Sequence, residues 1–198
     1  MRILQYSPLP TLSCDHLARK ECNTMATSDV DVSARRIACQ VLRDFISGRI
    51  TNDEFEKRLP DTRDGAVGAI WDTSWVFCDD FKAHRLDGKH RLSLNERRVC
   101  MRWLLFLHGK LPYEWPDLNL PGLDPAPRMQ SSFWRRLFSQ HQNLSEPEVK
   151  RFLSSGHFPV WPFTRVSDYK RALASPKFFA ASQRGRFQNY HLCEENLR

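Results

Sequence analysis

The segment from Phe45 to Pro60 constrains the fold most, because it carries three helix-boundary signals close together. Gly48 follows an apolar helical stripe, where a left-handed C-terminal cap is common. Thr51 and Glu54 have the spacing of a capping box, which begins a second helix. Pro60 ends that helix, because its ring and its missing N–H do not fit a helix interior. The segment therefore predicts two helices joined by a short turn.

Two further capping boxes indicate that helices recur along the chain. Ser93 and Glu96 precede the run 99–107, which is apolar nearly all round and therefore predicts the central helix of a bundle. Ser145 and Glu148 begin another helix near the C-terminus. The predicted fold class is mainly α, with a helical bundle core.

Helical periodicity predicts which faces of the first and third helices are buried. The apolar stripe of the first helix consists of Ala34, Ile37, Ala38, Val41, Leu42 and Phe45. Arg35 is expected to lie off this stripe. The third helix is expected to start at Asp61 or Asp64, with an apolar face that runs from Val67 to Phe81.

Changes in composition divide the chain into four parts. We expect residues 1–28 to be disordered or a non-native extension, 29–116 to form a helical core domain, 117–128 to be a proline-rich linker and 129–198 to be a basic α-helical C-terminal region. Prolines recur from residue 112 onward, which predicts a strap over the surface. Trp115 is expected to pin the start of this strap to the core.

The net charge of +7 is unevenly placed. Residues 1–127 hold 18 Lys/Arg and 18 Asp/Glu, whereas residues 128–198 hold 12 Lys/Arg and 5 Asp/Glu. This asymmetry indicates either an anionic partner for the C-terminal part or a basic solvated surface.

The six cysteines form no CxxC pair, and three of them fall within apolar helical patterns. This usage is typical of small buried hydrophobic residues in a reducing compartment rather than of a disulfide framework. No apolar run approaches the length of a membrane span. We therefore expect a cytoplasmic protein without a membrane partner.

Four residues could supply oxygen and nitrogen ligands to a metal: Asp79, Asp80, His84 and His90. Asp80 and His84 are four residues apart and would share one face of a helix. The alternative is the C-terminal turn of the third helix, in which Lys82, His84 and Arg85 complement the helix dipole.

A second candidate set could bind nucleic acid or a protein partner: Trp134, Arg135, Arg136, Lys150, Arg151, Arg165, Lys170 and Arg171. Basic side chains contact phosphates, and exposed aromatic rings stack on bases. Trp134-Arg-Arg and Trp161-Pro-Phe also have the composition of interface hot spots. The same aromatic residues could instead pack as a buried face with a basic rim.

Motifs for nucleophilic catalysis and nucleotide binding are missing, since the sequence contains no GxSxG, GxxxxGK or GxGxxG. No cofactor is predicted. The favoured hypothesis is a non-enzymatic interaction or regulatory module whose partner is another protein. Two alternatives stay open: nucleic-acid binding through the basic C-terminal region, and a metal-dependent enzyme that uses Asp80 and His84.

Two resemblances rest on short motifs. Phe45-Ile-Ser-Gly48 followed by Ile50-Thr-Asn-Asp-Glu-Phe55 resembles a SHOCT-type segment of bacterial proteins. Gly88-Lys-His90 and Tyr113-Glu-Trp-Pro116 resemble an uncharacterised family of bacterial proteins that carries this turn and this motif around a helix. The second resemblance implies a bacterial origin and assigns no catalytic residue.

Overall fold

A computed structural model describes residues 30–79, 82–129 and 144–174 of the chain. The elements are α1 (Val32–Ile46), α2 (Asn52–Arg58), α3 (Gly65–Ser74), α4 (Leu94–His108), α5 (Ala126–Met129), α7 (Glu146–Ser154) and α8 (Val166–Leu173), with short 3-10 turns η3 (Trp75–Phe77), η4 (Gly88–His90) and η5 (Phe158–Val160). Within these described ranges the regular structure is helical, apart from one isolated bridge between Thr51 and Arg85. The mainly α fold class is confirmed.

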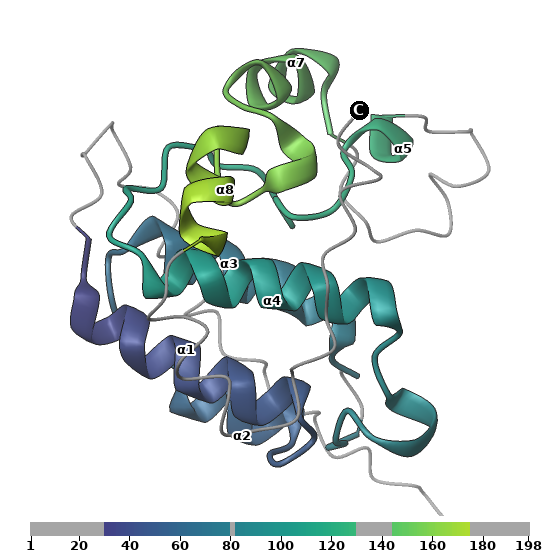
Figure 1. Cartoon of the computed structure of the whole chain (residues 1–198). Helices are drawn as coiled ribbons and strands as arrows, with labels where there is room; N and C mark the ends of the chain where they lie inside the picture. Colours follow the sequence, from purple (N-terminus) through teal and green to yellow (C-terminus); the bar gives the residue numbers. More distant parts are fainter. Residues whose placement is uncertain (1–29, 80–81, 130–143, 175–198) are drawn as a thin grey trace, which may run out of the picture.

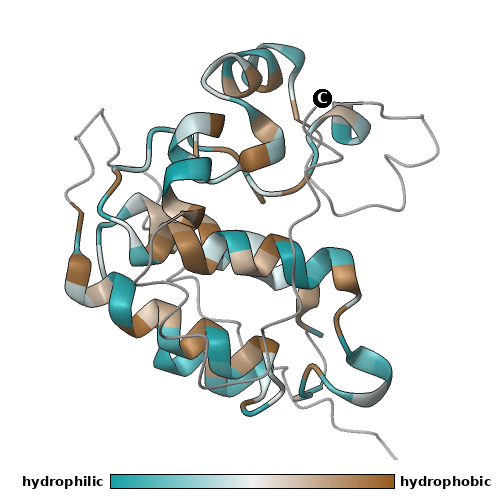
Figure 2. Cartoon of the chain, viewed as in Figure 1, coloured by the Kyte–Doolittle hydropathy of each residue, from teal (hydrophilic) through white to brown (hydrophobic). Residues whose placement is uncertain are grey.

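Helix α4 lies at the centre of the fold (Figure 1). Helix α1 packs along one side of α4, and α8 packs against the other side. Cys100 and residues 103–107 of α4 are buried, and Figure 2 shows apolar residues where α8 meets α4. A helix with neighbours on several sides has to be apolar nearly all round, as the sequence predicted.

The predicted helix boundaries at the caps are confirmed. Gly48 adopts a left-handed conformation, with φ of 70°. Capping boxes form at Thr51/Glu54, Ser93/Glu96 and Ser145/Glu148. Asp64, rather than Asp61, caps α3 through a hydrogen bond from the N–H of Ala66. Local capping chemistry therefore decides where these helices start.

The buried face of α1 differs from the predicted stripe. Ile37 is 47% exposed, whereas Arg35 is 1% exposed. Arg35 lies on the same face as Ala38 and Leu42, at helical spacings of three and seven residues. The other five residues of the predicted stripe are buried. The prediction was wrong at Ile37 and Arg35, because an ion pair with Asp64 allows a charged side chain to occupy the buried face.

Helix α3 is shorter than predicted. The α-helix ends at Ser74 and continues as the 3-10 turn η3, so its apolar face does not extend as one helix toward Phe81, which lies outside the described residues. The hydroxyls of Thr73 and Ser74 donate to the carbonyls of Ala69 and Trp71. Such bonds compete with the helix ladder, which accounts for the change of helix type at this point.

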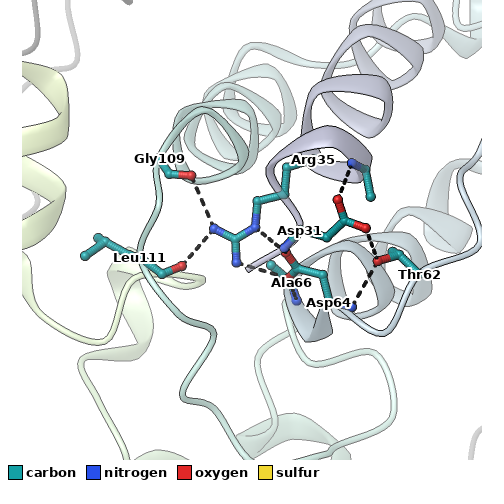
Figure 3. Close-up of polar contacts among 8 residues, drawn as sticks. Asp31, Arg35, Thr62, Asp64, Ala66, Gly109 and Leu111 are labelled. Atoms are coloured by element: carbon teal, nitrogen blue, oxygen red, sulfur yellow. Dashed lines mark hydrogen bonds and ion pairs between the residues drawn. The ribbon is translucent and has the colours of Figure 1, made fainter. Parts of the chain in front are cut away.

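Arg35 and Asp64 form a buried ion pair at the end of the core (Figure 3). Arg35 Nε and Nη2 donate to the two carboxylate oxygens of Asp64 at 2.6 and 3.0 Å. Nη1 donates to the carbonyls of Leu111 and Gly109 at 2.8 and 3.3 Å. The guanidinium also lies 5.2 Å from the ring centre of Phe106. One side chain thus joins α1, the start of α3 and the segment that follows α4.

The N-terminal caps of α1 and α3 are connected to this pair. Asp64 accepts from the N–H groups of both Ala66 and Asp31 at 3.0 Å. Asp31 caps α1 by accepting from the N–H of Ala34, and it accepts from the hydroxyl of Thr62. The Asp64 carboxylate therefore receives four hydrogen bonds, which offset much of the cost of burying its charge.

The C-terminal segment is tied to α4 and to the start of the strap. Arg102 donates to the carbonyls of Trp161 and Pro159, both at 2.6 Å. The indole of Trp115 donates to the carbonyl of Pro162 at 3.0 Å. Trp103 meets Trp161 edge-on, with ring centres 5.9 Å apart. The expectation that Trp115 attaches the strap to the core is confirmed, since Trp115 is only 4% exposed.

Gly122 marks the point where the strap packs closely against α3 and the C-terminal segment. Its N–H donates to the hydroxyl of Thr73 at 3.0 Å. A Cβ at this position would lie 2.6 Å from Thr73 Cγ2 and 2.6 Å from a ring carbon of Trp161. The strap is therefore held between α3 and the C-terminal segment, and only glycine fits there.

We predict that Arg35→Ala destabilises the fold strongly. The variant leaves the Asp64 carboxylate buried without its cation, which costs about 3–5 kcal/mol. Urea titration measures the free energy of unfolding. The control is Arg36→Ala, the exposed neighbour on the same helix, for which we expect a change within about 0.5 kcal/mol. Equal effects of the two variants would contradict the assigned role of the pair.

We predict that His108 makes stability fall in mild acid. Loss of hydration, and then the charge of Arg43, lower the pKa of His108, and the Arg43 guanidinium donates to its Nε2. The unfolded chain therefore binds a proton more readily than the folded protein, so stability decreases as the pH falls below about 6.5. His108→Gln should lose less unfolding free energy than the wild type between about pH 7.5 and 5.5. An unchanged pH dependence in urea titrations would show that another group is responsible.

Candidate functional site

A cationic segment connects the region after η3 to α4, and we refer to residues 82–91 as the basic loop. The basic loop lies beyond the N-terminal end of α4, at the lower right of Figure 1. Because α3 ends at Ser74, Lys82 and Arg85 lie far beyond its last turn. The dipole of α3 therefore does not account for these charges, since that effect is confined to the last turn.

Asn52 anchors the first half of the basic loop. Its side-chain amide donates to the carbonyl of Asp79 at 3.1 Å and lies 3.5 Å from that of Lys82. Its side-chain oxygen accepts from the N–H of His84 at 2.8 Å, and its own N–H donates to the carbonyl of His84 at 3.0 Å. Asn52 is 7% exposed. A buried residue with these contacts holds the loop backbone in one conformation.

The middle of the basic loop rests on the joint between α1 and α2. Arg85 pairs with Thr51 through the isolated bridge, and the side chain of Leu86 is buried. A Cβ on Gly48 would lie 3.4 Å from the Cβ of Asp87. The turn at Gly48 between α1 and α2 therefore also supports this loop.

The structure brings His84 and His90 of the predicted metal set together. Their ring centres are 4.6 Å apart. His84 Nε2 lies 3.0 Å from the carbonyl of Phe77, and Nδ1 lies 3.2 Å from that of Lys82. Both ring nitrogens thus face backbone oxygens rather than an open coordination position.

The two acidic members of that set are placed differently. Asp79 reaches this region through its backbone carbonyl, on Asn52. Asp80 lies outside the described residues. Within residues 30–79, 82–129 and 144–174, no group of three or more His, Cys, Asp or Glu side chains is arranged to hold a metal ion.

Four cations of the basic loop are exposed: Lys82, Arg85, Lys89 and Arg91. None of them forms an ion pair in the part of the chain that the structure describes. Asp87 is the single acidic residue between positions 82 and 91. The loop therefore presents an excess of positive charge to solvent, part of which is offset by Glu54 of α2, since the charge of Arg85 acts on that carboxylate.

The predicted C-terminal binding residues are only partly described. Lys150, Arg151, Arg165, Lys170 and Arg171 are exposed on or beside α7 and α8. Lys150 pairs with Glu146 at 2.5 Å, and Arg171 pairs with Asp168 at 3.3 Å. Trp134, Arg135 and Arg136 lie outside the described residues.

Trp161 and Phe163 belong to the core rather than to an exposed interface. Each is 1% exposed. Phe163 packs on Phe106 with ring centres 5.0 Å apart, and Trp161 packs on Trp103. Of the two readings that the sequence left open for these aromatic residues, the structure supports core packing.

The basic loop does not stand out as a unit when charge is counted over long stretches of the sequence. A charge count over residues 1–127 gives zero, because acids elsewhere cancel the local excess. Counting charge in a window of about ten residues would have found four cations against one acid between positions 82 and 91. The interaction with Asn52 has no comparable signal, because Asn52 belongs to a different helix.

Comparisons with protein-family models, with curated proteins and with solved structures found no match to this chain. The two motif resemblances therefore stay predictions. Among the described residues, no helix is both long enough and apolar enough to cross a membrane.

We predict that Asn52→Ala loosens the basic loop. The variant removes the acceptor for the His84 N–H and the donor to the Asp79 carbonyl, which costs about 1–3 kcal/mol. Hydrogen exchange of the His84 amide should accelerate by roughly fivefold or more. Glu56→Ala, at an exposed position of the same helix, is the control and should leave this amide unchanged. Unaltered protection in Asn52→Ala would rule out the anchoring role.

Proposed function

We propose that this protein is a non-enzymatic binding module that holds an anionic macromolecular partner through the basic loop. The observation that supports this best is the combination of exposed cations and a fixed backbone. Lys82, Arg85, Lys89 and Arg91 are exposed without ion pairs among the described residues, and Asn52 fixes the backbone of the first half of the loop. A preorganised cationic surface binds anions without a large ordering cost.

Burial argues against two of the cysteines as catalytic nucleophiles, which is compatible with the proposed non-enzymatic role. Burial raises the pKa of Cys39 to about 11, and burial also raises the pKa of Cys100. The two residues are 3% and 0% exposed. Thiols that stay protonated and out of contact with solvent are poor nucleophiles.

The two alternative functions have weaker support. For nucleic-acid binding through the C-terminal region, Lys150 and Arg171 pair with Glu146 and Asp168, which leaves Arg151, Arg165 and Lys170 exposed without ion pairs among the described residues. For a metal-dependent enzyme that uses Asp80 and His84, both ring nitrogens of His84 face carbonyl oxygens. Both alternatives also leave the charge of the basic loop without a role.

A regulatory role and a cytoplasmic location belong to the same proposal. The cysteines in the described ranges, Cys39, Cys78 and Cys100, are free thiols, as in proteins of a reducing compartment. A protein that binds without chemistry acts by recruiting or blocking its partner.

We predict that neutralising the basic loop weakens binding of polyanions. The probe is a fluorescently labelled polyglutamate or oligonucleotide, and the readout is fluorescence anisotropy with the full chain at low salt. Lys89→Ala combined with Arg91→Ala should weaken binding by roughly tenfold, because fewer counterions are released from the polyanion when the protein has two cations fewer.

The matched control combines Arg36→Ala with Lys110→Ala. Both residues are exposed. Arg36 lies near the start of α1 and Lys110 just after the end of α4, and both of these helix ends are remote from the basic loop. The control removes the same net charge and should change binding much less. Equal losses in both variants would show that net charge alone drives binding. If neither polyglutamate nor the oligonucleotide binds, the proposal is wrong.

A further inference from the structure

The basic loop consists of two arms that meet at the histidine pair. On the first arm, His84 stands between Lys82 and Arg85. On the second arm, His90 stands between Lys89 and Arg91. The ring centres of His84 and His90 are 4.6 Å apart, so the two arms come together with a pair of cations on each.

We propose that the basic loop binds single-stranded nucleic acid, with its four cations on the phosphates and the exposed ring of His90 against a base. This inference rests on the proposed function and names the class of its partner. Arginine and lysine side chains neutralise successive phosphates, and flat rings stack on unpaired bases. The loop supplies both kinds of group in one place.

The surroundings of the histidine pair favour stacking by His90 rather than His84. His84 is held by the carbonyls of Phe77 and Lys82 and is half-buried. His90 is exposed, at the end of η4. The ring of His90 therefore lies against the fixed ring of His84 at an interplanar angle of 40°, and His90 is exposed to an approaching nucleotide.

The apolar residues of the basic loop argue against an acidic protein as the partner. Protein interfaces depend on a few large aromatic or apolar anchors that become buried in the partner. Leu86 and the adjacent Leu92 are buried in this protein's own core, at 5% and 6% exposed, whereas Leu94 at the start of α4 is 52% exposed and is a single apolar side chain beside the loop rather than a cluster of anchors. Ala83 is the exposed apolar residue between positions 82 and 91. A surface of cations and one ring matches a sugar–phosphate chain better than a folded protein.

Charge sets the expected size of the salt dependence. Four cations on single-stranded phosphates give a slope of about −3 in log affinity against log salt, so binding should weaken about 50-fold between 50 and 200 mM salt. Removal of two cations should reduce this to roughly sevenfold. Polyglutamate shares the charge of nucleic acid but offers no base for the His90 ring.

The test measures binding of the full chain by fluorescence anisotropy to labelled single-stranded RNA, single-stranded DNA, duplex DNA and polyglutamate. We expect a single strand to bind more tightly than the duplex or polyglutamate, with the salt slope given above. His90→Ala should weaken single-strand binding about fivefold or more and leave polyglutamate binding unchanged, whereas His157→Ala, another exposed histidine, should change neither. Tighter binding of either single strand supports the inference and shows whether the partner is RNA or DNA.

Three outcomes would overturn it. Polyglutamate or duplex bound as tightly as single strands would remove the role of the bases but keep the proposed function. Single-strand binding lost in the triple variant Arg151→Ala, Arg165→Ala, Lys170→Ala, and kept in Lys89→Ala/Arg91→Ala, would move the site to the C-terminal helices. Absence of binding to all four probes would end both this inference and the proposed function.

Discussion

The buried pair of Arg35 and Asp64 is the interaction on which the rest of this fold depends. Hydrophobic burial brings helices together but does not fix their rotation or their register. Arg35 has five N–H groups in a rigid fork, and the structure uses them to join α1, the cap of α3 and the carbonyls that follow α4. Such a pair contributes specificity more than net stability, because its members are costly to bury and still more costly to separate.

At the opposite end of α1, aromatic packing holds the helix in place. Phe45 stacks on Phe55 with ring centres 4.4 Å apart, and Phe55 packs on Trp71. These contacts fix the turn between α1 and α2, on which the basic loop rests. The surface that we propose for binding is therefore fixed by the same aromatic packing that closes the core, and its rigidity does not depend on a partner.

The helices and their starts could be predicted from the sequence because the signals are local. A capping box such as Thr51 and Glu54 needs only four consecutive residues. The buried part of α4 can be recognised because its residues are nearly all apolar. The burial of Arg35 on α1 could not be predicted, because its partner Asp64 is twenty-nine residues away. For the same reason, hydrophobicity placed Ile37 in the core and Arg35 outside it.

The candidate site shows a similar division. His84 and His90 were predicted as candidate metal ligands because of their side-chain chemistry, and the structure places their rings in contact. The anchoring of their loop could not be predicted, because nothing in the sequence around Asn52 marks it as special. Its side chain bonds to residues that are 27 and 32 positions further along the chain. Cationic loops are visible in a sequence when charge is counted locally, but their fixed shape is a tertiary property.

The position of Gly122, between Thr73 and the ring of Trp161, determines how far the chain can be shortened. A protein cut after the strap would lose the cover over Trp103 and the acceptor for the Trp115 indole. It would expose a large aromatic surface of the kind that causes aggregation. The hydrophobic core therefore reaches at least to Tyr169, which packs on Phe163 with ring centres 5.4 Å apart, and the N-terminal helices share this core with the C-terminal segment.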